Sequence, residues 1–153
     1  MTSLCCNVLS SLKGKTLATA ESCTGGGIGA ALTAIAGSSE VYKGGIICYT
    51  NDIKNELLGV PAAYLNQFGA VSAPVAEAMA LGARQSLLAD IAVSVTGLAG
   101  PGGDDFGNPV GTVFIGYSDV NITLSEEYHF SGDRDYVRAR AIECALKLIL
   151  KFN

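Results

Sequence analysis

The run ATAESCTGGGIGAALT, residues 18–33, constrains the fold more than any other part of the sequence. Its first residues are small and apolar, as in a buried strand, and this run ends at Glu21 and Ser22. Three consecutive glycines, residues 25–27, then lead into a helix-like run. A strand, a glycine-rich turn and a helix in direct succession are typical of layered α/β folds, whose ligands bind at the carboxyl ends of the strands. The turn also carries a carboxylate, two hydroxyls and a thiol, so it is the first candidate for a functional site.

The rest of the chain alternates strand-like and helix-like segments. Strands that are separated by helices favour parallel pairing, whereas residues 111–130 favour an antiparallel hairpin. These patterns predict a mixed sheet with helices on both faces, in a single domain over residues 1–153. The expected strands are 16–20, 42–50, 91–97, 111–119 and 122–130, and the expected helices are 3–13, 25–36, 51–60, 61–69, 73–88 and 133–152.

Composition limits the class of partner. The net charge is −4, and no run of lysines and arginines is interleaved with aromatic residues. This argues against a nucleic-acid binder, which usually presents a basic patch. No segment resembles a signal peptide or a membrane span, so we expect a cytoplasmic protein without membrane contact. An anionic substrate would need a few local cations or the N-termini of helices.

Metal and cofactor chemistry find little support in the sequence. The five cysteines are odd in number and form no CxxC pair, which predicts reduced, mostly buried thiols. A single histidine, His129, rules out a zinc site with two histidines. Asp104 and Asp105 are able to hold a hard cation, although adjacent aspartates in a glycine-rich loop are more often solvated turn residues. We therefore expect no metal and no cofactor.

Two glycine-rich loops, SCTGGG and TGLAGPGG, follow two predicted strands, and each has a threonine before its glycines, Thr24 and Thr96. Neither loop matches a dinucleotide-binding or P-loop signature. Two interpretations stay open: the glycines form tight turns, or the two loops share a pocket. In the second case, backbone N–H groups would bind a phosphate or a developing oxyanion.

Lys54 falls in the first turn of a predicted helix whose N-cap is Asn51 or Asp52. The helix dipole disfavours a cation there, so Lys54 is either an ordinary solvated lysine or a base with a lowered pKa. Tyr49 ends the preceding strand and would lie close to it. Because Ser–Lys pairs activate a nucleophile without histidine, Ser22, Tyr49 and Lys54 form a candidate catalytic site.

Six motifs follow one another between residue 16 and about residue 148: AESCTGG, GGIICYTNDIKNELLGV, GAVSAPVAEAMALGAR, TGLAGPGG, PVGTV and FSGDRDYVR. Together they resemble the CinA C-terminal domain family, which includes stand-alone nicotinamide mononucleotide deamidases. The resemblance implies a three-layer α/β/α sandwich with a mixed, mainly parallel sheet. It also implies hydrolysis of the nicotinamide carboxamide, giving ammonia and nicotinic acid mononucleotide, in pyridine-nucleotide recycling.

The resemblance places the family's catalytic residues on Ser22, Tyr49 and Lys54, with Ser22 as nucleophile. Its terminal-helix arginine falls on Arg134 or Arg138, and the sequence does not choose between them. The residues that we expect to contact the substrate are Thr24, Gly25, Gly26, Thr96, Gly97, Gly100, Arg134 and Arg138.

Several alternatives remain at this stage. Cys23 is a competing nucleophile, although a packed bystander is expected, and Thr24 is expected to cap the following helix. Glu21 is either a substrate contact or a buried structural group. Asn108 stands where many relatives carry a basic residue, which weakens the case for a phosphate contact from that loop. A non-catalytic nucleotide-binding regulatory module is the alternative to the enzyme, and a homo-oligomer is left open.

Overall fold

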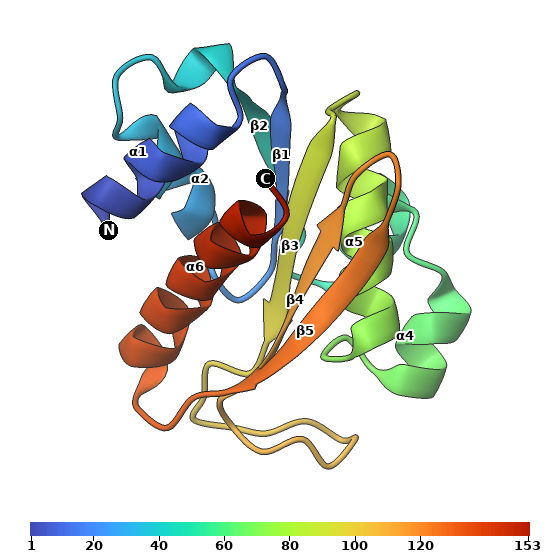
Figure 1. Ribbon diagram of the computed structural model, residues 1–153. Helices are drawn as coiled ribbons and strands as arrows, with labels where there is room; N and C mark the ends of the chain where they lie inside the picture. Colours follow the sequence, from blue (N-terminus) through green and yellow to red (C-terminus); the bar gives the residue numbers. More distant parts are fainter.

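A computed structural model describes residues 1–153 as one five-stranded sheet covered by helices on both faces (Figure 1). The three-layer α/β/α prediction is confirmed. The strands are β1 (Leu17–Glu21), β2 (Tyr42–Ile47), β3 (Ile91–Gly97), β4 (Thr112–Ser118) and β5 (Thr123–His129). The helices are α1 (Thr2–Ser11), α2 (Gly27–Thr33), the 3₁₀ turn η1 (Ser38–Glu40), α3 (Asn51–Leu58), α4 (Ala62–Phe68), α5 (Ala73–Ser86) and α6 (Arg134–Lys151).

The sheet has the strand order β2-β1-β3-β4-β5. Strand β1 pairs in parallel with both β2 and β3, whereas β4 pairs antiparallel with β3 and with β5. Four strands therefore run in one direction and only β4 runs in the other, which is the mixed, mainly parallel sheet that was expected. The β4–β5 hairpin supplies the antiparallel part because its connection is too short for a crossover.

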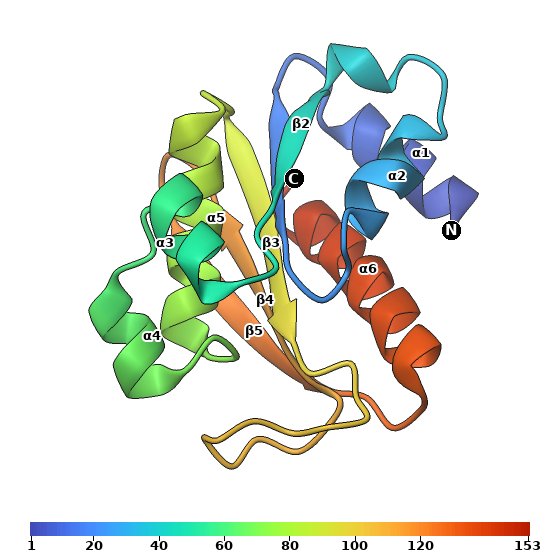
Figure 2. The same ribbon diagram turned by 180° about the vertical axis from the view of Figure 1, so that it is seen from behind.

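Each face of the sheet has its own hydrophobic core. Helices α1, α2 and α6 cover one face, with a core cluster of 22 buried residues, while α3, α4 and α5 lie on the other side, with a cluster of 11 (Figure 2). Strands β1 and β3 are almost fully buried because both of their faces are covered. No helix is both long enough and apolar enough to cross a bilayer.

The predicted elements are all present, with a few boundary corrections. Helix α2 runs over Gly27–Thr33 rather than over 25–36, and β2 ends at Ile47, so Tyr49 follows the strand instead of ending it. The N-cap of α3 is Thr50, whose hydroxyl accepts from the Ile53 N–H, and not Asn51 or Asp52. A threonine in extended conformation just before the helix can turn its hydroxyl back to this N–H group.

The topology places a potential site at the carboxyl end of β1. From β1 the chain crosses to β2 on one side, and from β2 it crosses to β3 on the other side of β1. Such a reversal of winding leaves a crevice beyond the strand ends, where ligands of open α/β sheets bind. The loops that follow β1, β2 and β3 all meet there.

Candidate active site

The turn after β1 carries Ser22 at the mouth of this crevice. Ser22 is 7% exposed, and its N–H donates to the Val95 carbonyl of β3 at 3.0 Å, so the strand pairing fixes its backbone. The next residues turn sharply because Gly25 and Gly26 have φ values of 61° and 97°. Residues with a side chain rarely adopt this left-handed backbone conformation, which explains the need for glycine at both positions.

Glu21 is a buried structural group beneath the turn. It is 2% exposed, and its carboxylate accepts from the N–H groups of Ile28 and Gly29 at 2.8 and 3.1 Å. The Thr24 hydroxyl donates to the same carboxylate at 2.8 Å, and the Thr19 hydroxyl donates at 3.3 Å. Glu21 thus satisfies the first N–H groups of α2, which Thr24 was expected to cap, and Gly26 occupies the N-cap position.

Lys54 lies beside Ser22 with its amine out of solvent. The residue is 1% exposed, and Nζ lies 3.0 Å from Ser22 Oγ and 2.8 Å from the Cys48 carbonyl oxygen. Lys54 forms no ion pair, because no carboxylate lies within 4 Å of its amine. Desolvation by burial therefore lowers the pKa of Lys54, and the shift favours the neutral amine that a general base requires.

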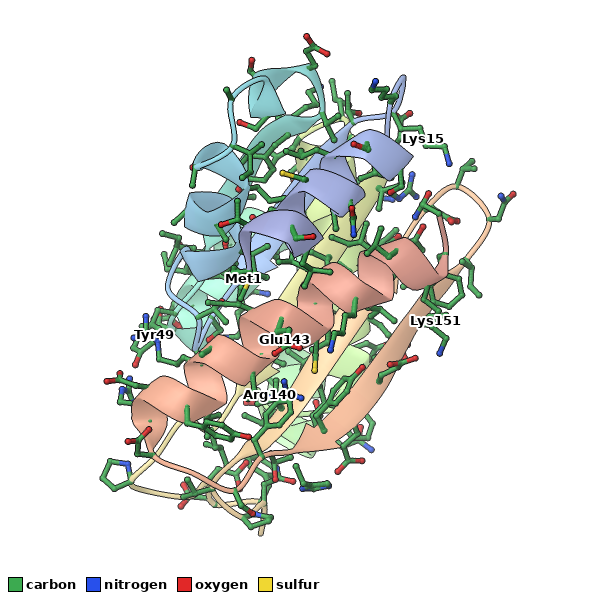
Figure 3. All side chains as sticks on the ribbon, turned by 60° about the vertical axis from the view of Figure 1, so that its left-hand side comes forward. Met1, Lys15, Tyr49, Arg140, Glu143 and Lys151 are labelled. Carbon is green, nitrogen blue, oxygen red and sulfur yellow. The ribbon has the colours of Figure 1, made fainter.

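Tyr49 and Arg134 meet at the exposed rim of the crevice. The Tyr49 side chain is 60% exposed, and its hydroxyl accepts from Arg134 Nη2 at 3.1 Å. Arg134 Nη1 donates to the Gly100 carbonyl at 2.7 Å. Figure 3 shows Tyr49 near the N-terminal end of α6. Tyr49 was expected to lie close to Lys54. The contact is made by the Tyr49 carbonyl oxygen, 3.5 Å from Lys54 Nζ, and not by the phenol.

Arg138 lies one helical turn further along α6, and it contacts the Ser22 turn instead of the rim. Its Nε donates to the Cys23 carbonyl at 3.1 Å, and Nη2 donates to the Thr24 carbonyl at 3.3 Å. The structure therefore separates the two arginines, which the sequence could not do. Arg134 lines the crevice, whereas Arg138 holds the backbone behind it.

A cavity of about 300 Å³ joins these groups. Seven residues predicted from the sequence line it: Ser22, Tyr49, Lys54, Thr96, Gly97, Gly100 and Arg134. Seven further residues line the cavity, and the sequence did not predict a site role for them, apart from Cys23 as a competing nucleophile. These lining residues are Cys23, Asn51, Ala70, Val71, Leu98, Ala99 and Gly102. Ala70 and Val71 belong to the GAVS motif, for which the sequence predicted no residue in the site.

Four of the residues expected to contact substrate do not line the cavity: Thr24, Gly25, Gly26 and Arg138. The Thr24 hydroxyl is bound to Glu21, and the turn glycines serve the backbone conformation. The Thr96 hydroxyl, although its residue lines the cavity, donates to the Ala70 carbonyl at 2.8 Å. Both threonine hydroxyls are therefore engaged in structural hydrogen bonds.

Cys23 is packed, as expected. It is buried in the core cluster beside α6, and burial raises the pKa of its thiol to about 11. A thiol with this pKa carries almost no thiolate near neutral pH, so it is a poor nucleophile there. Ser22 with its adjacent amine is the better candidate.

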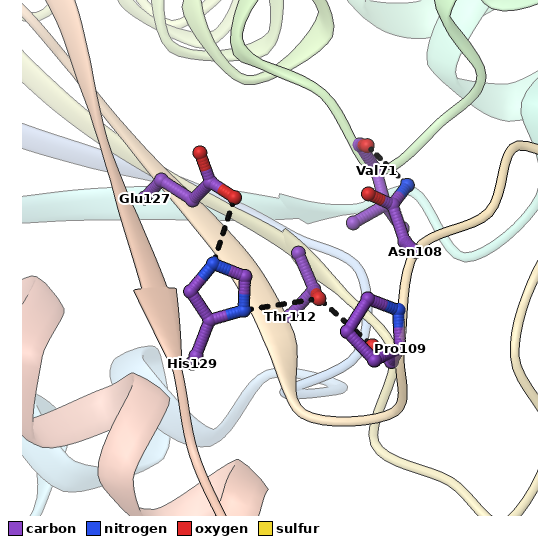
Figure 4. A network of polar contacts seen from close by, with 6 residues as sticks. All are labelled: Val71, Asn108, Pro109, Thr112, Glu127 and His129. Atoms are coloured by element: carbon purple, nitrogen blue, oxygen red, sulfur yellow. Dashed lines mark hydrogen bonds and ion pairs between the residues drawn. The ribbon is translucent and has the colours of Figure 1, made fainter.

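The second glycine-rich loop is held by polar contacts of its own (Figure 4). Asn108 donates from Nδ2 to the Val71 carbonyl at 3.2 Å and to Asp104 at 2.7 Å, so it braces a cavity wall. His129 pairs with Glu127 at 2.9 Å and lies 3.4 Å from the Thr112 hydroxyl, on exposed strand β5. It does not line the cavity, and a Ser-His-Asp triad is not assembled around it.

Comparison with known proteins identifies the family. A family model described as the CinA C-terminal domain matches residues 2–153. The chain belongs to the CinA C-terminal domain family. A CinA-like protein from Synechococcus sp. (strain RCC307) is 50% identical over 139 residues, which is 90% of this chain and 33% of that protein. One from Geobacter metallireducens is 54% identical over 82% of this chain and 30% of its own length. This CinA-family chain thus spans about a third of the curated relatives that it matches.

Solved structures of CinA-superfamily proteins have the same fold. The crystal structure of competence/damage inducible protein CihA from Agrobacterium tumefaciens is 40% identical, with a TM-score of 0.95, over 99% of this chain and 94% of that one. A CinA superfamily protein from Escherichia coli is 34% identical, with a TM-score of 0.92, over 99% and 87%. The fold and the family are therefore shared with these proteins, and the chemistry has to be argued from the site.

Proposed function

We propose that this CinA C-terminal domain hydrolyses the carboxamide of nicotinamide mononucleotide to nicotinic acid mononucleotide and ammonia. The observation that carries the proposal is the buried pair of Ser22 Oγ and Lys54 Nζ, 3.0 Å apart at the edge of a cavity. A hydroxyl next to a desolvated amine is the arrangement that activates serine without histidine. The resemblance of the six sequence motifs to nicotinamide mononucleotide deamidases supports the choice of substrate.

The proposed reaction begins with a neutral Lys54. The amine takes the proton of Ser22 as Oγ attacks the carboxamide carbon, and the C=O π pair moves to the oxygen. The Lys54 ammonium then gives that proton to the amide nitrogen, the C–N bond breaks, and ammonia leaves an ester on Ser22. Water attacks the ester with Lys54 again as base, and the proton returns to Ser22 Oγ as the acid departs.

The cavity walls suit the two ends of this substrate. Ala70, Val71, Leu98 and Ala99 offer an apolar slot of the kind that holds an aromatic ring. Arg134 lies at the exposed rim, where its planar guanidinium can exchange the Gly100 carbonyl for a phosphate oxygen. Tyr49 accepts a hydrogen bond from Arg134, so its proposed role is to orient that arginine rather than to relay a proton.

Ammonia release by the purified protein tests the proposal. We expect steady ammonia production from nicotinamide mononucleotide and mass-spectrometric detection of nicotinic acid mononucleotide. The non-catalytic alternative, a nucleotide-binding regulatory module, gives saturable binding of the mononucleotide by calorimetry with no ammonia. That result would reject the amidohydrolase and keep the pocket.

A further inference from the structure

Three peptide N–H groups in the Ser22 turn, those of Cys23, Thr24 and Gly26, donate to no acceptor within the protein. The N–H groups of Ser22, Gly25 and Gly27 all donate to backbone carbonyls at 3.0 Å. Of the three residues with a free N–H, Cys23 alone lines the cavity. The Cys23 thiol packs in the core cluster, yet the residue lines the cavity. Its peptide group is therefore the hydrogen-bonding group that Cys23 offers next to the Ser22 hydroxyl.

The carbonyls of this turn determine where those N–H groups point. In a trans peptide the C=O and the following N–H point in opposite directions. The Cys23 carbonyl is directed at Arg138 Nε, so the Thr24 N–H points away from the guanidinium. The Ser22 carbonyl accepts from the Gly25 N–H inside the turn, so the Cys23 N–H points out of the turn.

Arg138 is bound to this turn from a separate element. Its two hydrogen bonds both go to carbonyls of the turn, those of Cys23 and Thr24, and it has no carboxylate partner. Its neighbours Val137 and Ala141 are fully buried, so α6 holds the arginine in place. The guanidinium fork is rigid and spans two adjacent carbonyls, which a lysine amine cannot match.

We propose that Arg138 is a positioning residue: by holding the Cys23 and Thr24 carbonyls it fixes the turn so that the Cys23 N–H, at the cavity, serves as an oxyanion donor for the Ser22 reaction. The inference rests on the proposed amidohydrolase function. When Ser22 Oγ bonds to a carbonyl carbon, the oxygen gains a negative charge that preorganised N–H groups stabilise without rearrangement. In this role Arg138 helps to stabilise the transition state and does not affect substrate affinity, which distinguishes it from Arg134.

The test compares Arg138→Gln and Arg138→Lys with Arg140→Gln, a matched change on the same helix. Arg140 pairs with Glu143 and does not line the cavity. Besides ammonia release from the mononucleotide, p-nitrophenyl acetate is used, because its acylation of Ser22 also passes through an oxyanion. We expect Arg138→Gln to lower the acylation rate about 10- to 100-fold. This decrease is no larger than the one that usually follows when a single oxyanion-hole donor is removed. Arg138→Lys should fall between it and wild type, and Arg140→Gln should stay within about twofold of wild type.

Binding of the product separates positioning from general distortion. The dissociation constant for nicotinic acid mononucleotide, measured by calorimetry, should stay within about twofold in both Arg138 variants while kcat falls. An acylation rate at the wild-type level, or affinity that falls as steeply as kcat, would overturn the inference. If Arg138→Gln does not fold, Arg138→Lys decides the same question.

The ester also separates the two proposals. Wild-type protein that acylates through Ser22, as checked by its loss in Ser22→Ala, but releases no ammonia would reject the proposed substrate. The Arg138 comparison would still be decided with the ester. Protein inert towards both compounds would overturn both proposals.

Discussion

The two glycine-rich loops meet at the same sheet edge but are stabilised in different ways. The β1–α2 loop, residues 22–26, is short and lies between the buried Glu21 carboxylate and the Arg138 guanidinium. The β3–β4 loop, residues 98–111, is longer and mostly exposed, and its side-chain contacts centre on Asp104 and Asn108. The first holds Ser22 in one geometry, whereas the second supplies a wall of the cavity.

Glycine richness alone therefore does not indicate a common role. In the first loop, glycines permit a tight turn whose remaining residues are all buried. In the second, Gly100 faces the rim, and its carbonyl is bound by Arg134. Precise placement therefore belongs to the loop that lies between the buried Glu21 carboxylate and the half-buried Arg138 guanidinium.

Removing the proposed nucleophile, Ser22, should have the largest effect. We expect Ser22→Ala to reduce ammonia release by roughly 1,000-fold or more, because loss of a nucleophilic serine removes the covalent route. Circular dichroism and product affinity should remain as in wild type. Ser39→Ala, an exposed serine outside the cavity, serves as the control. If Ser22→Ala keeps near wild-type turnover, Cys23 becomes the nucleophile to test.

Glu21 and Asp104 compare the two loops in terms of stability. Glu21→Gln replaces an acceptor oxygen by an N–H₂ group that faces other donors, and we expect it to lower the free energy of unfolding by about 2 kcal/mol. Asp104→Asn keeps one acceptor oxygen in a partly exposed loop, and its effect should stay below about 1 kcal/mol. Urea denaturation measures both. Equal losses would show that the loops are held equally firmly.

The pH dependence tests Lys54. Because catalysis requires the neutral amine, kcat/KM should rise about tenfold per pH unit below the lowered pKa of Lys54 and level off above it. The unfolded state binds this proton more tightly, so the free energy of unfolding should also rise with pH between that lowered pKa and 10.5. Lys54→Met should remove this slope in stability, whereas the exposed Lys43→Met should retain it. A kcat/KM that stays flat as the pH falls below the lowered pKa of Lys54 would contradict its role as base.

Arg134 gives the smallest of these effects, at the outer end of the cavity. We expect Arg134→Lys to raise KM for the mononucleotide about fivefold, because lysine cannot present two parallel donors to a phosphate. KM for nicotinamide riboside, which lacks the phosphate, should change much less. Arg140→Lys is the matched control. Equal changes for both substrates would place the phosphate elsewhere, with the β3–β4 loop as the next candidate.

The sequence predicted the five strands and six α-helices, though not the 3₁₀ turn η1, because hydrophobic periodicity, glycines and prolines act locally. It also placed Ser22 and Lys54 together, since both follow strands that end at one sheet edge. It could not assign Arg134 and Arg138, because their four-residue spacing puts both on one side of α6. Their different partners depend on how α6 approaches two loops from distant parts of the chain.

By itself, the sequence determined the layered α/β fold and the glycine-rich turn. These follow from residue types and short-range spacing. Only the tertiary structure decided that Lys54 is desolvated, that Glu21 caps α2 from below, and that the Thr24 hydroxyl has a structural role. Burial and hydrogen-bond partners depend on contacts between segments far apart in sequence, and local patterns do not encode which donor reaches which acceptor.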